Sequence, residues 1–162
     1  MKWKAVVAGV LVLAAVIAAG LYSLRATQAP PGIALQPDNA AVVRRGAAVY
    51  QVHCASCHGA QLQGQPNWRE RGADGLLPAP PHDASGHTWH HPDEVLFRLT
   101  KHGVGREARI PDYKTAMPIY EGVLGDDDII AVLSWIKAQW PADIRARQER
   151  INAEHLKARA AS

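Results

Sequence analysis

The sequence predicts an all-α domain that follows an N-terminal membrane anchor. Residues 5–22 form an apolar block without a charged side chain. Further along, apolar residues recur at the three-to-four spacing of helices, and no convincing alternating strand pattern is found. With 162 residues, the chain has room for one folded domain with appendages.

The first predicted element is a transmembrane helix within residues 1–25. As a helix, residues 5–22 would be roughly 27 Å long, close to the roughly 30 Å hydrocarbon thickness of a bilayer. A cleaved signal peptide is the alternative, because Lys2 and Lys4 form the basic start that both kinds of segment share. The best pair of small residues for cleavage is followed at once by Pro30, which favours an uncleaved anchor.

The charges around this block predict where the rest of the chain lies. The positive-inside tendency keeps the two first lysines in the cytoplasm, so the exported part would face the periplasm from a bacterial inner membrane. The net charge of +3 comes from Lys2, Lys4 and Arg25, because residues 26–162 carry 15 basic and 15 acidic side chains. The basic balance therefore gives no indication of nucleic-acid binding.

Beyond the anchor, the pattern predicts a linker, a domain and a tail. Three prolines and one glycine oppose regular structure in residues 26–37, which we assign as the linker. Residues 38–141 form the predicted domain, and residues 142–162 form a charged tail that is prone to helix. The tail could contact a neighbouring subunit or anionic lipid, although a solvated appendage is the simpler interpretation.

Three helices are predicted in the domain. The first covers about residues 38–53, where apolar residues have helical spacing. The second covers residues 92–102, with a proline in its first turn and a glycine after its end. The third begins with a glycine and three aspartates at 125–128 and ends at Pro141. The Gly/Pro-rich stretch of residues 59–91 predicts mostly loop.

Both cysteines of the chain stand in one motif, Cys54-Ala55-Ser56-Cys57-His58. This pattern is typical of covalent haem attachment, in which the thiols add to two vinyl groups and the histidine ligates the iron. A thioredoxin-like dithiol would follow a strand in an alternating αβ chain. A zinc site would need about four ligands, and no second cysteine pair exists. In an exported chain the motif favours haem over both alternatives.

Met117 is the candidate for a second iron ligand, since the other methionine is the initiator. A thioether is a soft, neutral ligand that suits haem iron, and His/Met ligation raises the reduction potential. Pro118 biases Met117 toward an extended backbone and keeps this loop from forming a helix. A lone methionine is more often core filler, but the haem motif in the same chain reverses that preference.

Together these features resemble a small class I cytochrome c, most of all the membrane-anchored monohaem members of bacterial respiratory chains. The resemblance covers about residues 38–141. It is carried by RRGAAVYQVHCASCHG at 44–59, MPIYEGVL at 117–124 and DDDIIAVLSWIKAQWP at 126–141. It implies a cytochrome c-like fold around one haem c, in which the first helix packs against the last through Gly46, Tyr50, Leu133 and Trp135.

The resemblance also implies a one-electron carrier in a respiratory chain and not an enzyme, because iron with six tight ligands has no open position. The implied haem-binding residues are Cys54, Cys57, His58 and Met117. In the family a proline carbonyl orients the ligating histidine. Among the three prolines of LLPAPPHD, namely Pro78, Pro80 and Pro81, we choose Pro80.

The expected partners are redox proteins, namely a quinol–cytochrome c reductase, a terminal oxidase or a dehydrogenase, together with the membrane through the N-terminal helix. Two alternatives stay open. One is a haem enzyme or gas sensor in which Met117 detaches from the iron. The other is a fixed cytochrome subunit of an oxidase or dehydrogenase complex.

Other residues carry weaker indications. Trp89 is similar to a family tryptophan near the haem, but it is equally typical of an ordinary core. Basic residues recur between Arg98 and Lys114 and could steer an acidic partner, although acidic residues interrupt the run. Four histidines in polar surroundings are more typical of a surface than of iron ligands, and these are His87, His90, His91 and His102.

Overall fold

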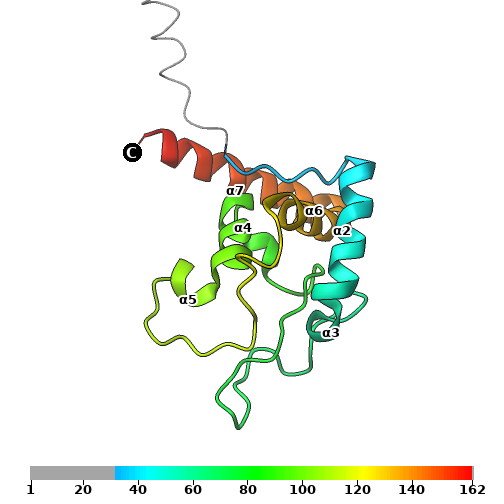
Figure 1. The fold of residues 1–162 in the computed structure, drawn as a ribbon. Coiled ribbons are helices and arrows are strands. Elements are labelled where there is room, and N and C mark those ends of the chain that lie inside the picture. Colours follow the sequence, from blue (N-terminus) through cyan, green and yellow to red (C-terminus); the bar gives the residue numbers. More distant parts are fainter. Residues whose placement is uncertain (1–31, 162) are drawn as a thin grey trace, which may run out of the picture. The chain divides into compact units, whose positions relative to one another are not determined.

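The structure is a computed structural model that describes residues 32–161. Its helices, in chain order, are α2 (Ala40–His53), α3 (Ala55–His58), the 3₁₀ turn η1 (Thr88–His90), α4 (Asp93–His102), α5 (Val104–Glu107), α6 (Asp126–Ala138) and α7 (Ala142–Ala160) (Figure 1). This part of the chain contains no strand, which confirms the predicted all-α class for it.

The predicted membrane anchor of residues 1–25 lies outside the described residues. Among residues 32–161, no helix combines the length and the apolarity needed to cross a bilayer.

The helix ends follow from capping chemistry. The side-chain oxygen of Asn39 accepts the backbone N–H of Ala41 at 3.1 Å, so α2 begins directly after Asn39. Helix α4 ends at Gly103, whose φ of 87° lies in the left-handed region that glycine enters without steric cost. Three aspartates at 126–128 occupy the first turn of α6, near the positive end of its dipole. The three predicted helices agree with these bounds to within three residues.

Helix α2 crosses α6 at Gly46. A Cβ atom on this residue would lie 2.0 Å from the carbonyl oxygen of Ala131 and 2.8 Å from the Cβ atom of Trp135. One turn further on, the ring of the fully buried Tyr50 lies 4.5 Å from that of Trp135, between centroids. The predicted contact is confirmed for these residues. Ala131, which the prediction did not include, makes the closest approach, and Leu133 is buried in the core.

We expect Gly46→Ala to lower the free energy of unfolding by about 2–3 kcal/mol, because the obstacle is backbone and the two helices would have to separate. Chemical denaturation of the purified protein measures this. Gly125→Ala is the matched control, since its Cβ atom would meet only Asp128 Oδ2 at 3.8 Å. Its expected cost is below about 1 kcal/mol. Equal costs for the two substitutions would contradict a tight crossing at Gly46.

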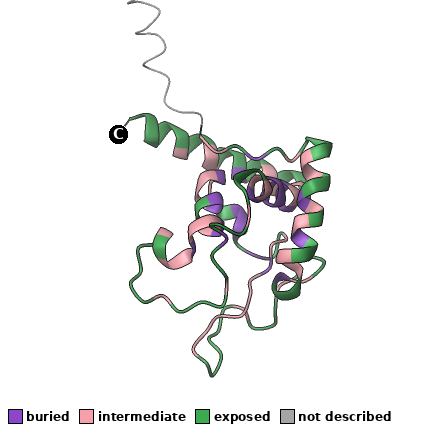
Figure 2. Cartoon of the chain, viewed as in Figure 1, coloured by how far each residue is buried: buried purple, intermediate pink, exposed green. Residues whose placement is uncertain are grey.

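The core lies among α2, α4 and α6, and buried residues gather on the facing sides of these helices (Figure 2). The long loop of residues 59–92 contributes Leu62 and Trp89 to it, although it holds no regular element except η1. The buried apolar residues of the three helices are Tyr50, Leu96, Phe97, Ile129, Ala131, Val132, Leu133 and Ile136.

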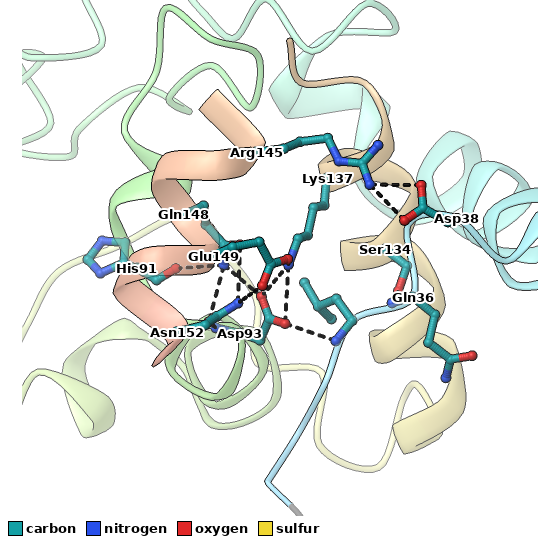
Figure 3. A network of polar contacts seen from close by, with 11 residues as sticks. Gln36, Asp38, His91, Asp93, Ser134, Lys137, Arg145, Gln148, Glu149 and Asn152 are labelled. Carbon is teal, nitrogen blue, oxygen red and sulfur yellow. Dashed lines mark hydrogen bonds and ion pairs between the residues drawn. The ribbon is translucent and has the colours of Figure 1, made fainter. Parts of the chain in front are cut away.

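A buried polar network holds α7 and the segment before α2 against this core (Figure 3). At its centre, the carboxylate of Asp93 accepts the backbone N–H of Leu35 at 3.0 Å and the side-chain amide of Gln148 at 2.6 Å. The Nζ atom of Lys137 lies 3.3 Å from the same carboxylate, and this lysine is only 1% exposed. Asn152 accepts the backbone N–H of Asp93 at 2.7 Å.

The compact unit extends beyond the predicted domain of residues 38–141 at both ends. It begins at Ile33, so the last five residues of the predicted linker of residues 26–37 belong to the domain. The reason is that Leu35 is buried and bonded to Asp93. Helix α7, predicted as a tail, packs on the domain through the fully buried Gln148.

Candidate functional site

The two cysteines lie on one helical turn directly after α2. Cys54 donates its backbone N–H to the Tyr50 carbonyl at 2.9 Å and so caps α2, and its own carbonyl accepts the N–H of His58 at 2.9 Å. Cys54 is half-buried, Cys57 is exposed, and neither forms a disulfide. Residues three apart on a helical turn share a face, so both thiols can reach one planar group beside α3.

The surroundings of these thiols weaken the two competing interpretations of the motif. Burial raises the pKa of Cys54 to about 11, and the neighbouring Cys57 adds to the shift. A redox-active dithiol needs a lowered thiol pKa instead. Within residues 32–161, no group of three or more histidine, cysteine, aspartate or glutamate side chains is placed to hold a metal ion, as a zinc site would require.

His58 is buried and its orientation is set by a proline. Its Nδ1 atom lies 2.8 Å from the carbonyl oxygen of Pro80. A carbonyl only accepts hydrogen bonds, so Nδ1 carries the proton and Nε2 keeps its lone pair for a metal. Burial lowers the pKa of His58 despite the opposing effect of the Pro80 bond, which keeps the imidazole neutral. Among the three prolines considered in the sequence, Pro80 makes this contact.

The loop that carries Pro80 is held against the cysteine motif by Gly64. The backbone N–H of Gly64 donates to the His58 carbonyl at 2.8 Å. Its φ is 66°, and a Cβ atom on it would lie 2.5 Å from the nitrogen of Pro81 and 2.7 Å from the carbonyl carbon of Pro80. Only glycine tolerates both the conformation and the close approach. Gly64 therefore lets the segment with Pro80 come close enough for its carbonyl to reach Nδ1 of His58.

Met117 is half-buried and packs against the core cluster from the loop before α6. Its backbone N–H donates to Thr115 Oγ1 at 3.0 Å. Three residues later, the Tyr120 hydroxyl donates to the carbonyl of His53 at 2.6 Å, directly before the first cysteine. The loop of residues 108–125, here called the methionine loop, is therefore tied to the end of α2, directly before the cysteine motif.

The prediction did not include His82, which lies beside His58. The two imidazole rings are stacked, with centroids 3.9 Å apart and an angle of 23° between their planes. Burial lowers the pKa of His82 well below its usual value, and the nearby His58 and His87 add to this, so the ring is neutral. His82 follows Pro80 by two residues in the sequence, and this closeness to a predicted site residue was the signal that the prediction did not use.

The remaining candidates contact neighbouring protein groups. Trp89 is buried and donates its Nε1–H to the carbonyl of Ala84 at 3.3 Å. His90 is exposed and stacks on Trp89 at 3.6 Å between centroids. At the end of α4, His102 Nδ1 lies 3.3 Å from a carboxylate oxygen of Glu121, but this contact does not have the geometry of a hydrogen bond. His87 and His91 contact each other edge to face, with centroids 5.7 Å apart.

The basic run between Arg98 and Lys114 is largely compensated. Arg98 bonds to Glu107 at 2.7 Å and Lys101 bonds to Asp126 at 2.6 Å. Arg106 lies 3.5 Å from Glu121. These pairs make a mixed surface, so the run does not form a purely basic patch.

The donor set fits a covalently attached haem. It comprises two thiols on one turn, a buried neutral imidazole with a free Nε2, and a thioether in a loop that is tied to the same turn. A family model described as cytochrome C oxidase, cbb3-type, subunit III matches residues 41–136. That range includes all five predicted site residues and ends before α7. No curated protein and no solved structure matches the chain.

Proposed function

The chain belongs to the family of cbb3-type cytochrome c oxidase subunit III and is a class I c-type cytochrome with covalently bound haem, and from this we propose that it carries single electrons with His58 and Met117 as axial iron ligands. One observation supports this most strongly. The Pro80 carbonyl lies 2.8 Å from Nδ1 of the buried His58, and this leaves Nε2 as a metal ligand beside the two cysteines.

Each site residue has a separate task in this proposal. When bound, haem supplies an iron that takes up and releases one electron. Cys54 and Cys57 would hold the group covalently, and His58, oriented by Pro80, would ligate its iron through Nε2. Met117 would supply a second, neutral sulfur ligand, which would favour the ferrous state and raise the potential.

The same ligand set makes the protein a carrier and not an enzyme. With His58 and Met117 both bound, the iron has no position for a substrate. The half-buried position of Met117 and the bond from Tyr120 to His53 oppose detachment of the thioether, which the sensor or enzyme alternative requires.

The proposed partners are redox proteins of a respiratory chain. The family description favours a partner within an oxidase complex, with a quinol–cytochrome c reductase or a dehydrogenase as electron source. We further propose that residues 5–22 anchor the protein in a bacterial inner membrane, with the haem domain in the periplasm. Gentle solubilisation of the membrane distinguishes a mobile carrier, whose haem migrates alone, from a fixed subunit, whose haem migrates in a large complex.

Spectroscopy of the domain, produced with haem-attachment machinery, tests the central proposal. We expect a single one-electron reduction, a weak long-wavelength sulfur-to-iron charge-transfer band in the oxidised protein, and no rapid binding of carbon monoxide at neutral pH. Rapid carbon monoxide binding without that band would instead support a haem sensor or enzyme.

A further inference from the structure

The stack of His82 on His58 has no role in the function proposed above. The hydrogen bond to Pro80 fixes the position of one ring atom of His58, but the ring can still tilt about that point. A second flat ring at 3.9 Å, inclined by 23°, restrains this tilt because it covers one face of the imidazole. The two contacts are complementary, since one acts on an edge of the ring and the other on a face.

His82 is itself held from three directions. Its backbone N–H donates to the carbonyl of Leu62 at 2.8 Å, and its carbonyl accepts the indole N–H of Trp140 at 2.7 Å. Its ring Nδ1 lies 2.8 Å from the hydroxyl of Thr88. The edge contact with the ring of Tyr50, at 6.4 Å and 72°, adds a fourth restraint. The backbone and the ring of His82 are therefore both held in place, and such a residue is preorganised as support for a functional residue.

We propose that His82 is a positioning residue for electron transfer, because it stacks on His58 and so fixes the plane of this axial imidazole. This inference rests on the proposed role of His58 as an iron ligand. The plane of an axial imidazole decides how the ring overlaps with the iron orbitals, and the surroundings of a ligand tune its donation to the metal. A leucine would fill the same space, but it offers no ring for Thr88 to hold.

The test compares three variants of the haem-loaded protein by electron paramagnetic resonance of the ferric state and by redox titration. In His82→Leu we expect a shifted and broadened signal, because the imidazole samples several planes. The midpoint potential should rise, because a loosely held imidazole donates less to ferric iron. Thr88→Val keeps the stacked ring but frees it to turn, so it should cause smaller changes in the same directions. His155→Leu, on α7, should change neither.

If the paramagnetic resonance signal and the midpoint potential of His82→Leu match those of the wild type, the inference is overturned. If that variant does not accumulate with haem, Thr88→Val decides in the same way, since it retains both imidazole rings. Failure of the underlying function is visible separately. A wild-type protein without the sulfur-to-iron band would refute His/Met ligation before any variant is compared.

Discussion

Replacing Met117 by alanine is expected to abolish the sulfur-to-iron charge-transfer band and to lower the midpoint potential by on the order of 0.1 V or more. The reason is that axial ligands set haem potentials over a range of about 0.8 V. A thioether stabilises ferrous iron, so its loss favours the ferric state. The open position should also bind carbon monoxide rapidly in the reduced protein. Optical spectra and a redox titration of the variant measure all three effects.

Ile119→Ala is the matched control for this experiment. It removes an apolar side chain from the same loop, but Ile119 is 56% exposed, whereas Met117 packs against the core. We expect the control to keep the band and the potential of the wild type. If Met117→Ala kept the band instead, Met117 would not be the ligand, and the methionine loop would have only a packing role.

The parts of the site that could be predicted from the sequence are those encoded locally. The cysteine motif is a single turn of chain, and the chemistry of its residues is independent of the rest of the fold. The contact of Gly46 with α6 could also be anticipated from the resemblance to class I cytochromes c, in which a glycine of the first helix packs against the last helix. The start of α6 after Gly125 and the end of α4 before Gly103 depend on the properties of single residues, so they too could be predicted directly.

The parts that could not be predicted depend on contacts between distant segments. His82 looks like an ordinary loop histidine until the fold brings it onto His58. Helix α7 looks like a solvated tail, because its buried contacts are made by Gln148 and Asn152 and not by an apolar stripe. A polar residue is buried when its partner is buried with it, and that partner, Asp93, is 55 positions away from Gln148.

Asp93→Ala is expected to lower the free energy of unfolding by about 2–4 kcal/mol, because it removes one of the two carboxylates that pair with the buried Lys137 and leaves only Glu149, at 2.5 Å. Lys137 is 1% exposed and Asp93 is 7% exposed, so neither is well solvated in the folded protein. The substitution also removes the acceptor of the Leu35 N–H and of the Gln148 amide. Unsatisfied buried donors add to the cost. Chemical denaturation measures the loss, and the exposed Asp143→Ala, which removes only a carboxylate from the first turn of α7, should cost less than about 1 kcal/mol.

A double variant separates the ion pair from the rest of the network. Adding Lys137→Met to Asp93→Ala removes the buried ammonium group, with which only Glu149 would still pair, so part of the stability should return, as it does when buried ion pairs become apolar. Recovery should be incomplete, because the donors of Leu35 and Gln148 still lack an acceptor. Full recovery would show that the hydrogen bonds to Asp93 contribute nothing. Since the proposed iron ligands lie on α3 and in the methionine loop, the haem spectrum of the folded variants should stay unchanged. Loss of stability with an intact spectrum would therefore show that the network stabilises the packing of α7 and of the chain before α2 on the domain.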